Sequence, residues 1–349
     1  MSEPTTSTGP SPDRSPGGLL QSASSTLMRV GGVFITVVIV MAIFAIASDG
    51  KFLIPANLLG MLRAMSTIAI LGLGLLVVIV VGEIDLSFAN LYGLCASTMA
   101  VVWIVWEWPV WWAIVAAFAV AIFWGAFNAF FTAITKIPSF IATLGSATLI
   151  FGMTLYITNT KRFNYLFPDP GQEIDPGQIE IFRGLANQAL PERFPMQAVW
   201  MIGIAIVFWF LMNRSLFGFR LKAIGGNPEA ARLARLPVTK YKFAAFIIAA
   251  CMACLASLLD FSFIGSAQPS AGQQLLFPTF AAVIIGGASL SGGRGSVAGT
   301  IAGALLLAVL ANGVALLAAG PFAQQFMLGT VTIGAVLLDQ FTQRRRGLI

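Results

Sequence analysis

The segment Ala223–Lys242 has the sequence AIGGNPEAARLARLPVTKYK, a polar and basic island in an otherwise apolar chain. Apolar residues run up to it at Trp200–Leu211 and continue after it at Phe243–Ile264, which predicts a loop between two membrane spans. Asn227 is a favourable helix cap and Pro228 a favourable first helical residue, and a helix-forming run follows them. The segment therefore predicts a short surface helix held between two spans, although an ordinary basic cytoplasmic loop would share its composition.

The composition of the 349-residue chain also indicates a membrane protein. Hydrophobic residues make up 58% and charged residues 10%, with a mean hydropathy of +0.87, whereas a soluble domain carries about 25% charged residues. The apolar runs are continuous rather than alternating, which predicts an all-α integral membrane protein and not a β-barrel. A span needs about 20 apolar residues, and ten segments qualify, at about 30–48, 60–81, 86–106, 108–134, 139–158, 195–213, 243–264, 275–290, 297–318 and 322–341.

Ten is not the only number of spans that the sequence allows. The second and third runs abut at Gly82–Asp85, and the eighth run is short and interrupted. Eight or nine spans with a re-entrant segment would fit as well. We therefore expect about ten transmembrane helices, some of them broken or re-entrant.

The two ends of the chain differ in composition from the apolar body. Residues 1–29 are rich in Ser, Thr, Pro and Gly, which predicts a disordered cytoplasmic tail. The apolar run that follows is a full span long and lacks a small-residue cleavage pattern, so we expect it to stay as the first helix. The predicted transmembrane domain is 30–341, with a cytoplasmic loop at 214–242, and residues 342–349 form a basic cytoplasmic tail.

The distribution of Lys and Arg predicts the orientation in the membrane. With a cytoplasmic N-terminus, the loops 265–274 and 319–321 are outside, and they contain no Lys or Arg. The exceptions are Lys51, Arg63 and the long loop 159–194, and long loops have little influence on orientation. The net charge of +6 is then explained by topology and anionic lipid, without a nucleic-acid partner. The basic residues placed inside are Lys136, Arg294, Arg344–Arg346 and those of 214–242.

Absent residue types exclude several kinds of chemistry. The chain contains no histidine, which excludes His-based acid–base catalysis and His-ligated zinc or haem. It contains no GxxxxGK[ST] phosphate-binding loop, so ATP hydrolysis would have to come from a partner. Cys251 and Cys254 lie in an apolar run with no further ligand nearby, and we interpret them as small helix-packing residues. We expect no metal site and no catalytic residue.

Five motifs, in register, resemble those of bacterial ATP-binding-cassette (ABC) importer permeases of the ribose/xylose simple-sugar type. They extend across about residues 55–320. The motifs are Gly82–Ser87 (GEIDLS), Ile137–Gly145 (IPSFIATLG), the island Ala223–Lys242, the glycine-rich turn Gly286–Ser296 (GGASLSGGRGS) and Ala311–Gly313 (ANG).

The resemblance implies a permease subunit that binds no cofactor itself. Two copies of a cytoplasmic ATPase, which carry ATP and Mg, would bind below it, an extracytoplasmic solute-binding protein above it, and a second permease subunit beside it. Closure of the ATPases would push the coupling helix and drive alternating access in a bacterial inner membrane. The residues implied in coupling are Asn227, Pro228, Glu229, Ala230, Ala231 and Arg235.

Polar residues among the apolar runs are candidates for the transport pathway. A charge inside a bilayer is costly and usually faces a polar cavity, which makes Asp85 a candidate. Alternatively, Asp85 could meet water at the cytoplasmic surface or cap a helix N-terminus. The amides could equally form hydrogen bonds between helices. The candidates are Asp85, Ser87, Asn90, Asn128, Phe140, Gln273, Gln274 and Asn312.

Glycines near the same motifs predict helix breaks. We interpret the glycine-rich turn as a place of close backbone approach rather than a phosphate-binding loop, because it lacks the lysine and is flanked by spans. Gly299–Gly303 forms a GxxxG pattern suited to tight helix contact, either within one subunit or between two. The predicted helix-break glycines are Gly82, Gly286, Gly287, Gly292 and Gly293.

The chain departs from the family pattern at several positions. Glu83 replaces the second glycine of GGIDLS, and Arg235 stands where the family usually has glycine. Leu276–Pro278 replaces the Glu-Leu-Asp that members often carry, which removes two carboxylates near the expected pathway. A related subgroup therefore fits better than the ribose permease itself.

The sequence thus predicts the permease subunit of an importer for a sugar or a similar small polar solute. A nucleoside or another small solute is an alternative substrate. An ATP-independent secondary transporter or channel is the alternative from another class, and a membrane-embedded enzyme fits less well. Neither the solute nor the choice between homodimer and heterodimer follows from the sequence.

Overall fold

The computed structural model of the protein describes residues 16–170, 172–187, 194–317 and 320–345. The elements up to the first loop are α1 (Pro16–Ala47), η1 (Lys51–Leu53), α2 (Pro55–Val80), α3 (Phe88–Ala100), η2 (Val101–Val105), α4 (Val110–Ala129), η3 (Phe130–Ile134) and α5 (Ser139–Thr158). The remainder are β1 (Phe163–Asn164), α6 (Pro176–Gly184), α7 (Met196–Asn213), α8 (Leu216–Gly226), α9 (Pro228–Leu233), α10 (Val238–Ile264), β2 (Ser266–Ala267), η4 (Gln273–Leu275), α11 (Leu276–Ile285), α12 (Val297–Leu316) and α13 (Gly320–Arg345).

The all-helical membrane architecture agrees with the sequence, whereas the predicted number of spans is not confirmed. Seven helices in the described part of the chain are long and apolar enough to cross a membrane. Two further apolar helices, Gly31–Ala47 and Gln273–Ile285, are shorter than that. The predicted count of about ten is therefore not confirmed.

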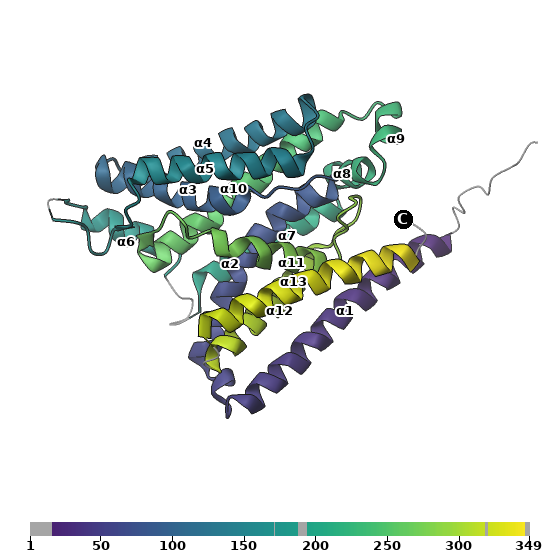
Figure 1. The fold of residues 1–349 in the computed structure, drawn as a ribbon, viewed down its shortest axis with the longest axis horizontal. Coiled ribbons are helices and arrows are strands. Elements are labelled where there is room, and N and C mark those ends of the chain that lie inside the picture. The colour runs from purple at the N-terminus through teal and green to yellow at the C-terminus, as the bar shows by residue number, and fades with distance from the viewer. Residues whose placement is uncertain (1–15, 171, 188–193, 318–319, 346–349) are drawn as a thin grey trace, which may run out of the picture.

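Helix α2 lies in the centre of the molecule and contacts α7, α10, α11 and α12. In Figure 1, α4 and α5 run along one edge and α1 and α13 along the other, with α2 between them. Residues Ile68–Val80 of α2 are buried, as expected for a helix that is apolar on every side. By contrast, α4 and α5 keep large apolar side chains such as Phe123 and Ile141 exposed, as helices facing lipid do.

Loops that the sequence places outside meet at one end of the bundle. Strand β1 pairs antiparallel with β2, which joins the loop 159–194 to the segment after α10. Trp103 packs beside this pair against Tyr165, Phe182 and Phe261, with ring centroids 5.0–6.4 Å apart. The loops that the sequence places inside meet at the opposite end of α10, where Lys242 contacts Glu83.

The segment that follows α10 is not the plain exterior loop predicted at 265–274. Helix α10 ends at Gly265, which has a φ of 81°, and the chain then turns into the bundle. A Cβ at Gly93 of α3 would lie 2.6 Å from the Pro269 carbonyl oxygen, and one at Gly272 would overlap the Ala89 carbonyl. Non-helical backbone at this depth is tolerated because it is buried in protein or borders a cavity.

The eighth predicted span, 275–290, is correspondingly shorter than expected. The helix there is α11, of 10 residues, which is too short to cross a bilayer. It follows the segment between α10 and α11, residues 265–275, and ends at Ile285, with Gly286 as its C-cap. A helix broken at this point is one of the alternatives that the sequence left open, and a re-entrant path in the membrane stays a prediction.

The first helix begins earlier than the predicted end of the tail at residue 29. Helix α1 begins at Pro16, and the sequence contains neither Pro nor Gly between Gly18 and Gly31 that would interrupt it. The rest of the predicted tail, residues 1–15, lies outside the described residues, as do residues 346–349 of the predicted basic tail.

Candidate functional site

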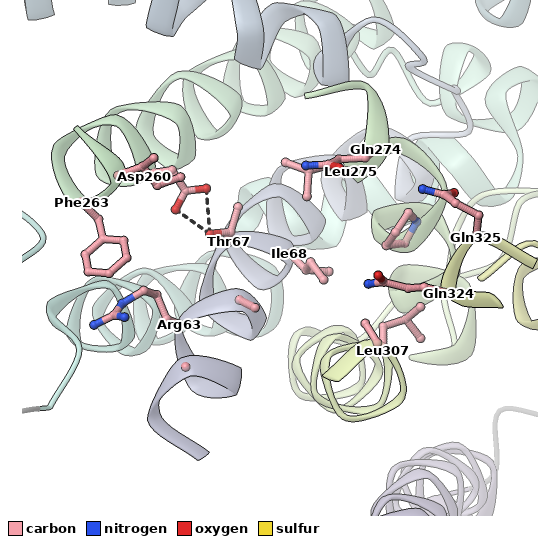
Figure 2. Close-up of a pocket in the computed structure, with 15 residues that line it drawn as sticks. Arg63, Thr67, Ile68, Asp260, Phe263, Gln274, Leu275, Leu307, Gln324 and Gln325 are labelled. Atoms are coloured by element: carbon pink, nitrogen blue, oxygen red, sulfur yellow. Dashed lines mark hydrogen bonds between the residues drawn. The ribbon is translucent and has the colours of Figure 1, made fainter. Parts of the chain in front are cut away.

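A cavity of about 490 Å³ lies where α2, α10, α11, α12 and α13 meet (Figure 2). Its volume falls in the range of about 300–1,000 Å³ that is usual for small-molecule sites. Gln274 and Leu275 of η4, which leads into α11, form part of its wall. The polar side chains that line it are Arg63, Thr67, Asp260, Gln274, Gln324 and Gln325, and apolar ones include Ile68, Leu275, Pro278 and Leu307.

Hydroxyl groups from α2 and α3 converge on the carboxylate of Asp260 in α10. The Thr67 hydroxyl of α2 donates to it and lies 2.9 and 3.0 Å from its two oxygens. The Tyr92 hydroxyl of α3 donates to Oδ2 at 2.6 Å. A carboxylate offers about four acceptor positions, so these contacts hold Asp260 in place and leave acceptor capacity toward the cavity.

Arg63 is held beside this carboxylate by two contacts of its own. Its Nε donates to Gln197 Oε1 of α7 at 3.4 Å, and its Cζ lies 3.6 Å from the centroid of the Phe263 ring. Gln197 is buried, and its Nε2 has no hydrogen-bond partner among the described residues. One guanidinium and one carboxylate thus face the same cavity, which gives its described lining no net charge.

Sequence reasoning missed this cluster. It treated Arg63 as an exception to the charge rule and did not consider Asp260 at all. A signal was present, because Asp260 is a single carboxylate in the apolar run CLASLLDFSFI, and ionisable residues inside spans are usually functional.

The predicted pathway residues Asp85, Ser87 and Asn128 lie together, but away from this cavity. Asp85 and Ser87 occupy the break between α2 and α3, where the Ser87 amide and hydroxyl donate to Asp85 Oδ1 at 2.8 and 2.7 Å. Asn128 Nδ2 of α4 donates to the Ser87 hydroxyl at 2.7 Å, and its Oδ1 has no partner in the described part of the chain. Asp85 thus holds Ser87, the residue before the first turn of α3, which begins without a side-chain cap hydrogen bond. Its role as a pathway residue or as a helix cap stays a prediction.

The same break is held by the start of α5. The Ile84 amide donates to the Ser139 hydroxyl at 3.0 Å, and the Leu86 amide donates to Thr143 Oγ1 at 3.1 Å. Backbone groups freed by a broken helix need partners inside a membrane. The motifs Gly82–Ser87 and Ile137–Gly145 therefore form one structural unit.

The remaining pathway candidates are dispersed. Asn90 Nδ2 donates to the Ala147 carbonyl at 2.8 Å, and Asn312 exchanges two 2.9 Å hydrogen bonds with Asn57. Phe140 is exposed on the outside of α5, and Gln273 precedes Gln274 in η4. Of the eight candidates, all of them described, Gln274 lines the cavity, and the role of the others in transport stays a prediction.

Glycines from three segments meet where α2, α8 and the glycine-rich turn come together. Gly82 has a φ of 88°, and Gly292 and Gly293 have φ values of 82° and 74°, a region of backbone space that favours glycine. A Cβ at Gly292 would lie 2.6 Å from the Gly225 carbonyl oxygen, and the Gly293 amide donates to the Val80 carbonyl at 2.9 Å. We call Gly82, Gly225, Gly292 and Gly293 the glycine junction.

The predicted GxxxG contact forms within the chain. A Cβ at Gly299 would overlap the carbonyl of Gly286, and one at Gly303 would overlap the carbonyl of Ala282. Helices α11 and α12 therefore pack backbone to backbone, which answers the question that the sequence left open.

The predicted coupling helix is present as α9. The Asn227 side chain accepts a hydrogen bond from the Ala230 amide at 2.9 Å, and Pro228 begins the helix, as the sequence predicts. Glu229 and Ala230 are exposed, whereas Ala231 is buried. The helix thus presents one face outward while its other face anchors it.

Residues on either side of α9 have constrained conformations or contacts. Arg235 adopts a φ of 57° after the helix, the left-handed region in which a glycine would be less strained. Lys222 Nζ of α8 donates to the Met212 carbonyl at 2.9 Å, and burial lowers the pKa of this amine.

Among the described residues, no group of three or more Cys, Asp or Glu side chains is placed to hold a metal ion.

Comparison with known proteins gives consistent matches over nearly the whole chain. A family model described as "Branched-chain amino acid transport system / permease component" matches residues 57–336. The chain is 30% identical to the xylose transport system permease protein of Escherichia coli (strain K12), over 94% of this chain and 96% of that protein. It is 34% identical to the ribose import permease protein of Bacillus subtilis (strain 168), over 88% of this chain and 91% of that protein.

Proposed function

Because this chain belongs to the family of transport-system permease components, with ABC permeases of the ribose/xylose type among its relatives, we propose that it imports a sugar or a similar small polar solute as the membrane-spanning subunit of an ABC importer. The observation that carries this proposal is the match to xylose and ribose permeases over nine-tenths of the chain. The cavity supports it, since it has the size of a small-molecule site and its lining combines apolar and polar side chains without net charge among the described residues.

The proposed mechanism is alternating access driven from α9. In this mechanism two cytoplasmic ATPase subunits bind ATP and Mg, contact the exposed face of α9 and close together. The movement of α9 is transmitted through the end of α8 to α2 and the glycine-rich turn, because the glycine junction leaves no side chains between these backbones. Interfaces packed this tightly move as units rather than deform continuously.

The other partners follow from the same proposal. A solute-binding protein would dock at the end formed by α6 and the β1–β2 pair, and a second permease subunit would complete the translocation unit. The location would be the inner membrane of a bacterium, with the N-terminus and α9 in the cytoplasm.

A second candidate substrate class has support from one observation. The description of the matching family names branched-chain amino acids. Arg63 and Asp260 line the cavity, and their opposite charges suit the carboxylate and the ammonium group of an amino acid. The xylose and ribose names of the relatives favour a sugar.

Uptake by the complete transporter tests the proposal. Vesicles that contain the permease with its ATPase and binding protein should accumulate radiolabelled D-ribose or D-xylose only when ATP is supplied. Uptake without ATP, or accumulation of leucine but of neither sugar, would overturn it.

A further inference from the structure

The cavity around Asp260 combines features that match one class of ligand. Asp260 retains acceptor capacity after binding Thr67 and Tyr92. Figure 2 shows Asp260 and Arg63 on one side of the cavity and Gln324 and Gln325 on the other. A sugar hydroxyl both donates and accepts hydrogen bonds, and so does a glutamine amide.

The apolar part of the lining suits the same ligand. Ile68, Leu275 and Leu307 border the cavity between the two polar sides. Small-molecule sites typically combine an apolar surface with a few placed polar groups, and the C–H face of a sugar ring can lie against such a surface.

The charges in the cavity disfavour a charged ligand. The Arg63 guanidinium is engaged by Gln197 and by the Phe263 ring, and Asp260 by Thr67 and Tyr92. An anionic ligand would therefore compete with the internal partners of Arg63 and be repelled by Asp260. A cationic ligand would compete with the internal partners of Asp260 and be repelled by Arg63. A neutral ligand needs only the unused acceptor positions of Asp260 and the amides.

The segment between α10 and α11 links a ligand in this cavity to transport. Gln274 and Leu275 belong to the 3-10 turn η4, which leads from the irregular part of that segment into α11. Discontinuous helices commonly build substrate sites in membrane transporters, because their irregular backbone is tolerated where it lines a cavity.

We propose that this cavity is a transient binding site for a neutral polyhydroxylated solute of aldopentose size, in which Asp260 accepts hydroxyl hydrogens and Gln274 fixes the solute's orientation. The inference rests on the proposed function, and it adds a site within the permease that reads hydroxyl groups after the binding protein has released the solute.

Cysteine protection tests binding without the partner proteins. The variant Ala64→Cys, at an exposed position of the cavity lining to which no binding role is assigned, is placed in a permease whose Cys95, Cys251 and Cys254 are replaced by alanine. Its labelling by a small thiol reagent is then measured. D-ribose or D-xylose should slow the labelling, whereas leucine and sodium chloride should not. Labelling of Glu173→Cys, an exposed exterior position away from the cavity, should be unaffected by any of them.

The variant Asp260→Asn then assigns the carboxylate. A hydrogen bond to a charged group commonly changes affinity by about tenfold or more, so the sugar concentration for half-protection should rise at least about tenfold. Asp169→Asn, an exposed carboxylate outside the cavity, should leave it unchanged. Thermal unfolding of each variant identifies a folding defect, and Asp260→Glu provides a second carboxylate variant in which protection should partly return.

Transport by the complete system separates this inference from the proposed function. With the binding protein saturated by each sugar, the wild type should carry D-ribose faster than 2-deoxy-D-ribose, and Asp260→Asn should lose that preference. Sugar uptake by the wild type without protection at Ala64→Cys would overturn the site and leave the proposed function intact. Protection by leucine instead would overturn the sugar site, and absence of ATP-dependent sugar uptake by the wild type would overturn the proposed function.

Discussion

Lys242 donates to the carboxylate of Glu83 in an ion pair that joins the first turns of α10 to the break between α2 and α3. The side chains are 16% and 10% exposed, respectively, so solvent screens the pair only partly. In the GGIDLS pattern that Gly82–Ser87 resembles, the position of Glu83 is a glycine. The pair therefore provides a fixed contact beside the glycine junction, where that pattern has a flexible residue.

This contact predicts a stability effect that depends on both partners. Glu83→Gln leaves the Lys242 ammonium without its counter-charge, which should lower the free energy of unfolding by about 1–3 kcal/mol and the melting temperature of the purified protein. The double variant Glu83→Gln/Lys242→Met should recover part of that loss, because it leaves no buried charge unpaired. A double variant as unstable as the sum of both single variants would show that the pair does not couple these segments.

The positions of the loops predict opposite accessibility for two single cysteines. Glu180→Cys lies on α6 beside the exterior end of the bundle, and Thr239→Cys lies at the other end of α10; both native side chains are exposed. A membrane-impermeant thiol reagent applied to intact cells or spheroplasts should label Glu180→Cys, and Thr239→Cys only after permeabilisation. Labelling of both from the same side would contradict the predicted orientation.

The exposed face of α9 predicts where the ATPase contact can be disrupted. Ala230→Trp should abolish most ATP-driven uptake while membrane insertion and melting temperature stay normal, because a bulky side chain overpacks a close contact. Glu229→Arg should have a similar effect through its reversed charge. Ala230→Ser is the matched control and should retain uptake; normal uptake by both Ala230→Trp and Glu229→Arg would reduce α9 to a basic loop.

The hydrogen bonds of Asp85 predict that its shape matters more than its charge. Asp85→Asn keeps an Oδ1 that can accept from Ser87, so we expect normal folding and uptake. Asp85→Ala removes the acceptor and should cost about 0.5–2 kcal/mol of stability. Loss of uptake in a stable Asp85→Asn protein would instead support the role in the pathway that the sequence suggested.

The two amides Asn312 and Gln274 predict different outcomes for the same substitution. Asn312→Ala leaves Asn57 without its partner and should lower stability by about 1–3 kcal/mol, with little change in solute preference among the molecules that fold. Gln274→Ala removes a side chain from the cavity lining and should alter uptake or solute preference at normal expression. Measurement of expression, melting temperature and uptake for both variants distinguishes a packing role from a cavity role.

The sequence by itself determined the local features of this protein. Continuous apolar runs predict helices, and observed helices such as α5 and α7 fall within one or two residues of their predicted limits at 139–158 and 195–213. Asn227 and Pro228 predict the start of α9, because capping depends on residues only three positions apart. The family motifs were recognisable for the same reason, since each is a short contiguous stretch.

The tertiary structure alone decided which distant residues share a site. Thr67 and Asp260 are 193 positions apart, and Tyr92 and Asp260 are 168 apart, so no periodicity within a helix could pair them. The path of the segment between α10 and α11 also depends on non-local contacts with Ala89 and Gly93. These contacts explain why a segment that the sequence predicts to be an uncharged loop contributes to the wall of a cavity. Hydrophobic pattern specifies that a segment is buried, whereas packing of several helices together specifies which polar groups meet there.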